Sequence, residues 1–143
     1  MSAEGLELIG EVGLDRIREA GWPVELVGGL TMGADPVSYA IARASRITPP
    51  LIDAFSVRKE LKRHGTGQRI EGCFRPSVPV VVTEDVITTG GSAVTVLDIL
   101  RDAGALISGV LAVVDRGEGG RAAIEAAGVP VCVLVSASDL GLR

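Results

Sequence analysis

The chain has 143 residues, of which 47% are hydrophobic and only 3% aromatic, so a core must be built from Val, Leu, Ile and Ala. Its net charge of −4 argues against bulk binding of nucleic acid. The longest nearly apolar run, 105–114, is far shorter than the ~20 residues that span a membrane. Cys73 and Cys132 have no metal-site or disulfide-type spacing, and no signal peptide is readable. We therefore expect one cytoplasmic domain over 1–143, without nucleic-acid or membrane partners.

Apolar runs alternate with helical stretches, which predicts an α/β domain with an open, mostly parallel, five-stranded sheet flanked by helices. Asp35 and Ser92 are the expected N-caps of the second and third helices. In chain order we expect helix 4–20, strand 24–27, helix 35–45, strand 51–57, strand 78–83, helix 92–103, strand 106–114, helix 120–127 and strand 129–134.

Ligand sites in open sheets lie beyond the carboxyl ends of the strands. Four segments follow expected strands directly, and we expect all four to meet at one edge of the sheet. They are 28–33, 58–69, 84–92 and 115–116.

Positive charge is concentrated in one short stretch, here named the basic segment (residues 58–69). It contains both lysines of the chain, its only histidine and three arginines, opposed by a single glutamate. A solvated surface loop is the alternative, but this concentration in an acidic chain favours an anion site. The cations are Arg58, Lys59, Lys62, Arg63, His64 and Arg69.

The turn that follows the strand at 78–83 has the composition of a phosphate-binding loop. It reads Thr-Thr-Gly-Gly-Ser over 88–92 and opens a helix. Backbone N–H groups at such a helix start, aided by the helix dipole, can cradle a phosphate. Gly90 and Gly91 permit close approach of the backbone, while no lysine or glycine spacing of the known nucleotide motifs is present.

Two acids, Glu84 and Asp85, end the strand just before this turn. They would repel a phosphate, so they suit ribose hydroxyls or the surroundings of a metal ion. An ordinary strand-to-helix turn with two solvated acids is the alternative, but the strand, the acid pair and the turn together favour a ribose-phosphate site.

These segments carry a resemblance to a known family. Residues 81–92 resemble the phosphoribosyl-pyrophosphate (PRPP) signature of type I phosphoribosyltransferases. Residues 57–67, Val-Arg-Lys-Glu-Leu-Lys-Arg-His-Gly-Thr-Gly, are similar to the mobile catalytic loop of the orotate phosphoribosyltransferase family. Residues 27–36 look like its pyrophosphate-binding loop, and 114–116 match its strand-end Asp-Arg pair. The resemblance implies the type I phosphoribosyltransferase fold.

The resemblance also implies a reaction, in which orotate and PRPP give orotidine 5-monophosphate and pyrophosphate during pyrimidine biosynthesis. Mg²⁺ is the implied cofactor, held mainly by the substrates and not directly by protein residues. The leaving pyrophosphate gathers negative charge in the transition state, where a cation should meet it. The implied catalytic residues are Lys62, His64 and Asp85, and His64 is either a general acid or a plain anion binder.

The substrate contacts implied by the resemblance fall on two sets of residues. Orotate would contact Thr88 and Arg116, although an ion pair of Arg116 with Asp115 or Glu118 is the alternative. PRPP would contact Arg58, Lys59, Lys62, His64, Glu84, Asp85, Val86, Ile87, Thr88, Thr89, Gly90, Gly91 and Ser92.

The sequence departs from the family at two places. Met32 stands where many relatives carry lysine, and nothing in 1–5 resembles the hood that grips orotate, so an incomplete hood is expected. The alternatives to the orotate enzyme are a PRPP-sensing or catalytically impaired module and a phosphoribosyltransferase for another base. By resemblance we expect a homodimer in which the 58–69 loop reaches the neighbouring active site.

Overall fold

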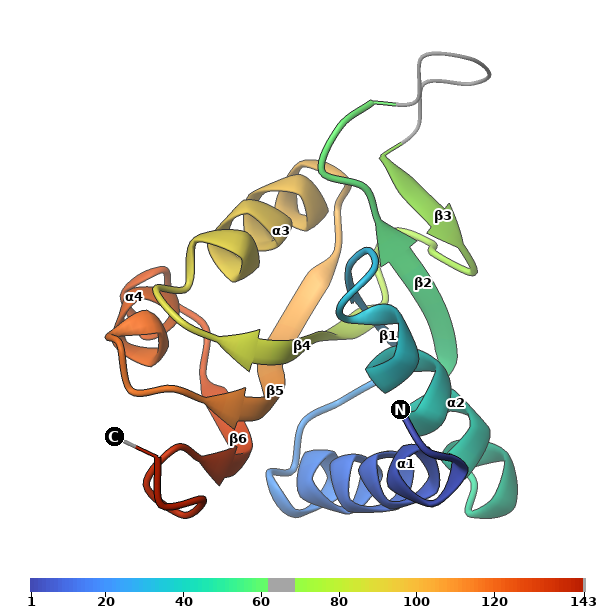
Figure 1. The fold of residues 1–143 in the computed structure, drawn as a ribbon. Helices are drawn as coiled ribbons and strands as arrows, with labels where there is room; N and C mark the ends of the chain where they lie inside the picture. The colour runs from blue at the N-terminus through green and yellow to red at the C-terminus, as the bar shows by residue number, and fades with distance from the viewer. Residues whose placement is uncertain (62–68, 143) are drawn as a thin grey trace.

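The computed structural model describes residues 1–61 and 69–142, in which six strands form one sheet between two layers of helices (Figure 1). The strands are β1 (Leu26–Leu30), β2 (Asp53–Val57), β3 (Ile70–Gly72), β4 (Pro79–Ile87), β5 (Leu106–Asp115) and β6 (Val131–Ser136). The helices are α1 (Ala3–Glu19), α2 (Asp35–Ile47), α3 (Gly91–Asp102) and α4 (Gly120–Ala126). Within these described ranges, no helix is long and apolar enough to cross a membrane.

The strands lie in the order β3-β2-β1-β4-β5-β6, and every neighbouring pair is parallel except β2 and β3. The helices cover opposite faces, with α1 and α2 on one side and α3 and α4 on the other (Figure 1). Central strand β4 is buried on both faces: Val80 and Val82 pack toward α3, whereas Val81 packs toward α1 and α2. This pattern explains the continuous apolar run at 78–82.

The expected number of five strands is wrong, because β3 adds a sixth at the edge of the sheet. This strand has only three residues and runs antiparallel to β2, with Val57 opposite Ile70 and Phe55 opposite Gly72. So short a strand produces no apolar run or alternation in the sequence. Its pairing with β2 brings the two ends of the basic segment together, since the Arg58 N–H donates to Arg69 O at 2.7 Å.

Both expected helix caps are also wrong. Helix α2 has Ala34 as its N-cap, and Asp35 is already its first residue. Helix α3 begins at Gly91 with Gly90 as its cap, so Ser92 lies inside the helix. Gly90 has a φ of 84°, and a Cβ there would lie 2.7 Å from Gly120 O. The positive φ and the close approach of Gly120, the first residue of α4, therefore require glycine at this cap.

Strand β1 extends three residues beyond the end at residue 27 that the sequence predicts. Gly28 and Gly29 are both buried inside the strand, and Gly29 lies beside Ser56 of β2. A Cβ on Gly29 would overlap Thr83 O of β4 and lie 2.6 Å from the Ala34 side chain. The glycine therefore lets β1, β4 and the start of α2 converge.

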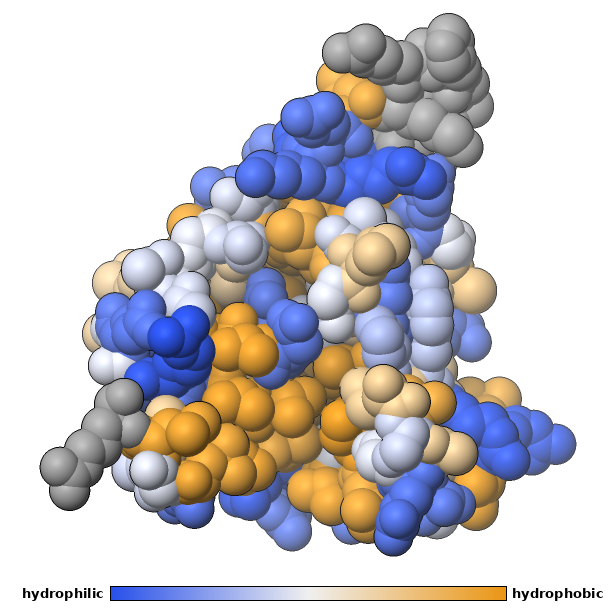
Figure 2. All heavy atoms as spheres, viewed as in Figure 1, coloured by the Kyte–Doolittle hydropathy of each residue, from blue (hydrophilic) through white to orange (hydrophobic). Residues whose placement is uncertain are grey.

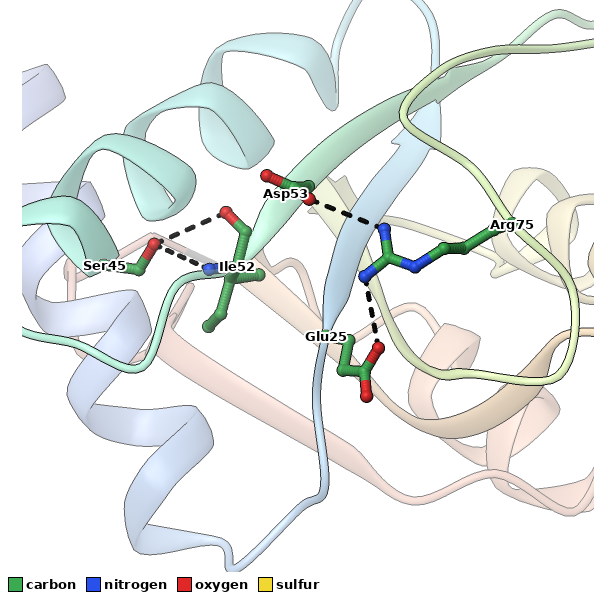
Figure 3. Close-up of polar contacts among 5 residues, drawn as sticks. All are labelled: Glu25, Ser45, Ile52, Asp53 and Arg75. Carbon is green, nitrogen blue, oxygen red and sulfur yellow. Dashed lines mark hydrogen bonds and ion pairs between the residues drawn. The ribbon is translucent and has the colours of Figure 1, made fainter.

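Polar contacts hold the opposite, amino edge of the sheet (Figure 3). The Arg75 guanidinium lies 3.1 Å from the Glu25 carboxylate, just before β1, and 3.5 Å from Asp53 at the start of β2. Nearby, the Ile52 N–H donates to the buried Ser45 hydroxyl of α2 at 2.9 Å. These contacts secure the strand starts, leaving the carboxyl edge for loops that carry polar groups.

Candidate active site

The carboxyl edge of the sheet brings the predicted segments together. The Thr31 N–H, after β1, donates to Val57 O at the end of β2, at 2.8 Å. At the other side of the site, the Arg116 N–H donates to Ile87 O at 3.0 Å, joining the ends of β4 and β5. The described parts of all four predicted segments therefore lie along one edge of the sheet.

The turn between β4 and α3 forms a small cup. A cavity of about 50 Å³ is lined by Glu84 and by the residues from 86 to 93. The Val94 N–H donates to Gly90 O at 3.0 Å, so the N–H groups of 91–93 precede the first helical hydrogen bond. Such N–H groups, at the positive end of the helix dipole, are suited to an anion. The size and polarity of the cup fit one phosphate group better than the ring of a nucleobase.

The two acids beside the cup have different surroundings. Glu84 is only 5% exposed, and its Oε1 atom has no hydrogen-bond partner among the described residues. Burial, and secondarily the neighbouring Asp85 carboxylate, raise the pKa of Glu84 from 4.5 to about 7. Asp85 is exposed, and its Oδ1 accepts a hydrogen bond from the Val86 N–H at 2.9 Å. Glu84 is thus a buried acceptor that lacks a donor, as a site for a ligand hydroxyl requires.

The first cation of the basic segment already has a partner. The Arg58 guanidinium forms an ion pair with Glu71 of β3, at 3.1 Å, and its buried Nε has no partner within the described ranges. Lys59 is exposed, and its carbonyl accepts a hydrogen bond from the Arg69 guanidinium. Lys62 and His64 lie outside the described residues. Glu71 was not anticipated, although it is the first carboxylate after the basic segment.

Arg116 makes one of the ion pairs considered from the sequence. Its guanidinium lies 2.9 Å from the Glu118 carboxylate, and both side chains are more than 40% exposed. Asp115 instead accepts a hydrogen bond from the Gly117 N–H at 2.9 Å. The Thr88 carbonyl, on the adjacent loop, accepts from the Gly120 N–H at 3.0 Å. A ligand of Arg116 would therefore compete with Glu118.

A hydrogen-bonded cluster that the sequence analysis missed lies beside the loop after β1. Thr31 Oγ1 and Ser56 Oγ each donate to the Asp35 carboxylate, at 2.6 and 2.7 Å. Strand register, which places Ser56 next to Gly29, creates this contact, and no local sequence pattern indicates it. A second hydrogen bond, between the buried hydroxyls Ser38 Oγ and Thr83 Oγ1 at 2.7 Å, links α2 to β4 just before Glu84.

An apolar groove begins next to Asp85. Figure 2 shows apolar side chains gathered over the carboxyl ends of β4, β5 and β6. The groove, of about 590 Å³, is lined mainly by Ile9, Met32, Val86, Val113 and Val114, together with Asp85 itself. The polar cup and this apolar surface therefore flank the two acids.

Carboxylates beside the cup are the metal-ligating groups that the site offers. Within 1–61 and 69–142, no three side chains of His, Cys, Asp or Glu cluster as a metal cage would need. Mg²⁺ commonly binds through one or two carboxylates plus substrate oxygens. Asp85, exposed beside Glu84, fits that arrangement.

Comparisons with known proteins agree with this geometry. No family model matches the chain. The orotate phosphoribosyltransferase of Aquifex aeolicus is 45% identical over 137 residues, which cover 96% of this chain and 74% of that protein. The chain belongs to the orotate phosphoribosyltransferase family. The family member of Corynebacterium glutamicum is 46% identical over 143 residues, covering all of this chain and 75% of that protein.

A solved member of the orotate phosphoribosyltransferase family has the same fold. It is the Mycobacterium tuberculosis H37Rv enzyme, crystallised in complex with PRPP. The match has a TM-score of 0.81 at 42% identity and covers 96% of this chain and 76% of that one. The predicted phosphoribosyltransferase fold is therefore confirmed, with six strands in place of five.

Proposed function

We propose that the chain transfers the 5-phosphoribosyl group of PRPP to orotate, giving orotidine 5-monophosphate and pyrophosphate in pyrimidine biosynthesis. Its membership of the orotate phosphoribosyltransferase family supports this, as does the PRPP complex of the M. tuberculosis relative. The observation that carries the proposal is the phosphate-sized cup directly beside a buried carboxylate that lacks a donor.

In the proposed binding mode, the 5-phosphate of PRPP occupies the cup. Backbone N–H groups at the start of α3 bind it, together with the Thr88, Thr89 and Ser92 hydroxyls. The 2- and 3-hydroxyls of ribose donate to Glu84 and Asp85, because carboxylates accept hydroxyl hydrogen bonds strongly. This supplies the partner that Glu84 Oε1 lacks.

The diphosphate then faces the basic segment. As the bond between ribose C1 and the diphosphate breaks, its electron pair goes to the diphosphate oxygen and positive charge develops on the sugar ring. A deprotonated ring nitrogen of orotate supplies the electron pair of the new bond to C1. Lys62 and His64, outside the described residues, are proposed to meet that charge as it develops. Arg58 and Lys59 would assist, with Arg58 exchanging its Glu71 ion pair for the diphosphate. Arg116 is proposed to bind orotate together with Thr88.

Mg²⁺ is the proposed cofactor, held mainly by substrate oxygens. Bound there, it would neutralise part of the diphosphate charge. Asp85 is the residue of this chain best placed to orient it, since its carboxylate is exposed beside the cup.

We further propose that residues 1–143 act as a single domain that forms a homodimer, in which the basic segment of one copy reaches the site of the other. The resemblance of that segment to the family's mobile loop supports this. A cytoplasmic location is proposed because Cys73 and Cys132 are both free thiols.

The test is formation of orotidine 5-monophosphate from orotate, PRPP and Mg²⁺. We expect turnover in the wild-type chain and a loss of at least about a hundredfold in kcat for Lys62→Ala, because a leaving-group cation acts mainly in the transition state. Calorimetry should show that the variant still binds PRPP.

Other outcomes separate the alternatives. PRPP binding without turnover on any base would support a sensing module, and turnover with a purine but not with orotate would assign another base. Equal kcat for Lys62→Ala and the wild type would contradict the role of Lys62.

A further inference from the structure

An aspartate at the start of α2 links the loop after β1 to the end of β2. Asp35 accepts one hydrogen bond on each carboxylate oxygen, from Thr31 Oγ1 at 2.6 Å and from Ser56 Oγ at 2.7 Å. The Tyr39 hydroxyl lies 3.1 Å from Ser56 Oγ and extends the cluster to the surface. Hydrogen bonds to an ionised carboxylate are about twice as strong as neutral ones. Asp35 therefore connects the loop after β1 to the end of β2 through two strong hydrogen bonds.

These bonds are not a helix cap. A capping carboxylate accepts from the backbone N–H groups of its own first turn. At the start of α2 no side chain makes such a bond, and the cap position is Ala34. An acid that only favoured the helix dipole would not need both hydroxyls. The geometry points instead to a role in the placement of the loop from 31 to 33.

That loop lies directly against the proposed ribose site. A Cβ on Gly33 would be 2.7 Å from Asp85 Oδ2, so the loop backbone abuts this carboxylate. Met32, at the centre of the loop, is 82% exposed, so packing of its side chain does not hold the loop in place. Ser56, the second hydrogen-bond donor to Asp35, lies two residues before Arg58, where the basic segment begins.

We propose that Asp35 is a positioning residue that fixes the 31–33 loop beside Asp85 and against the end of β2, where the diphosphate of PRPP binds. The proposal rests on the proposed function. Asp35 itself makes no contact with substrate; it acts through the loop backbone and through Ser56. Loss of either hydroxyl should loosen the loop and weaken PRPP binding, without impairing the chemical step.

The test uses Thr31→Val and Ser56→Ala, which each remove one donor with little change of shape. We expect KM for PRPP to rise about tenfold, the worth of one charge-assisted hydrogen bond, with kcat and KM for orotate within about twofold. Thr31→Ser should restore the wild-type KM. Thr48→Val is the matched control, because it removes a threonine hydroxyl bonded at 3.2 Å to Ala44 O at the far end of the same helix.

Hydrogen exchange gives a second readout that needs no substrate. Amides of 31–34 should exchange faster in Thr31→Val and Ser56→Ala, whereas those of 38–47 should not. A wild-type KM for PRPP with unchanged exchange, or a lower Tm alone, would overturn the proposal. If the wild-type chain neither bound nor turned over PRPP, the proposed function would fail, and the exchange data would still decide whether Asp35 fixes the loop.

Discussion

At the scale of single residues, the proposed site depends on two adjacent carboxyl groups, of Glu84 and Asp85, that differ in burial. Glu84 and Asp85 are neighbours in sequence and point to opposite faces of the sheet. Glu84 is buried like the four residues before it, whereas the exposed part of β4 begins at Asp85. Burial makes the Glu84 anion costly, so its pKa rises to about 7. A ribose hydroxyl that donates to Glu84 would favour the anion, and PRPP binding near neutral pH would then release a proton.

The raised pKa of Glu84 predicts a pH-dependent stability. The folded state holds the Glu84 proton more tightly than the unfolded chain does. The contribution of this proton to the free energy of unfolding is therefore fully present below pH 4.5 and is lost as the pH rises through about 7. The loss attributable to Glu84 is about 3 kcal/mol. Glu84→Gln should therefore be more stable than the wild type at pH 8 and nearly equal at pH 4.5, in urea unfolding without ligand.

The exposed Glu7→Gln is the control for that experiment and should follow the wild-type curve. Equal stability of Glu84→Gln and the wild type at pH 8 would show that the buried carboxylate is satisfied by a donor, such as water.

At the scale of the elements, the apolar pattern of the sequence predicted the buried strands. It did not predict features that depend on which strands pair and in which register. The central parts of strands β4 and β5 lie in the core, where Val80–Val82 and Val110–Ala112 are buried, and these apolar runs made both strands recognisable in the sequence. Strand β3 has three residues and depends on β2 for its existence. Asp35 looked like a helix cap because its partner Ser56 is 21 residues away, brought near only by β1–β2 pairing.

The two contacts at the amino edge of the sheet should differ in strength. Arg75 and its acids are about half exposed, so Arg75→Ala should cost no more than about 1 kcal/mol, and less at 1 M salt. Ser45→Ala leaves the buried Ile52 N–H without an acceptor, which costs about 1–3 kcal/mol at any salt concentration.

Urea unfolding at low and high salt checks both values. A larger or salt-independent effect of Arg75→Ala would mean that the ion pairs at this edge act as a network rather than as exposed pairs.

At the scale of the whole molecule, the acid-rich chain has both of its lysines and its histidine within one short segment of the sequence, residues 58–69. The proposed ribose-phosphate site lies at the carboxyl edge of the sheet, whereas the proposed leaving-group cations belong to the basic segment. If one site is divided between two copies of the chain, as proposed, activity would be a property of the dimer.

Mixing two inactive variants tests that division. Lys62→Ala lacks the proposed leaving-group cation, and Asp85→Asn lacks a ribose ligand, so each homodimer should be nearly inactive. If the segment crosses between copies, random reassociation should restore roughly a quarter of wild-type activity, from one intact site in each mixed dimer. No recovery, with mixed dimers demonstrated by sedimentation or mass spectrometry, would place each segment over its own site.

The pairing of β3 with β2 also makes the stability of the sheet nearly independent of the length of the basic segment. Because the Arg58 N–H meets the Arg69 carbonyl, both ends of the basic segment are anchored at neighbouring points of the sheet. Doubling the length of a loop closed in this way costs only about 0.6 kcal/mol. Insertions and deletions between these anchors would thus alter catalysis while leaving the sheet intact. The fold can therefore tolerate wide variation in the segment that is proposed to carry the leaving-group cations.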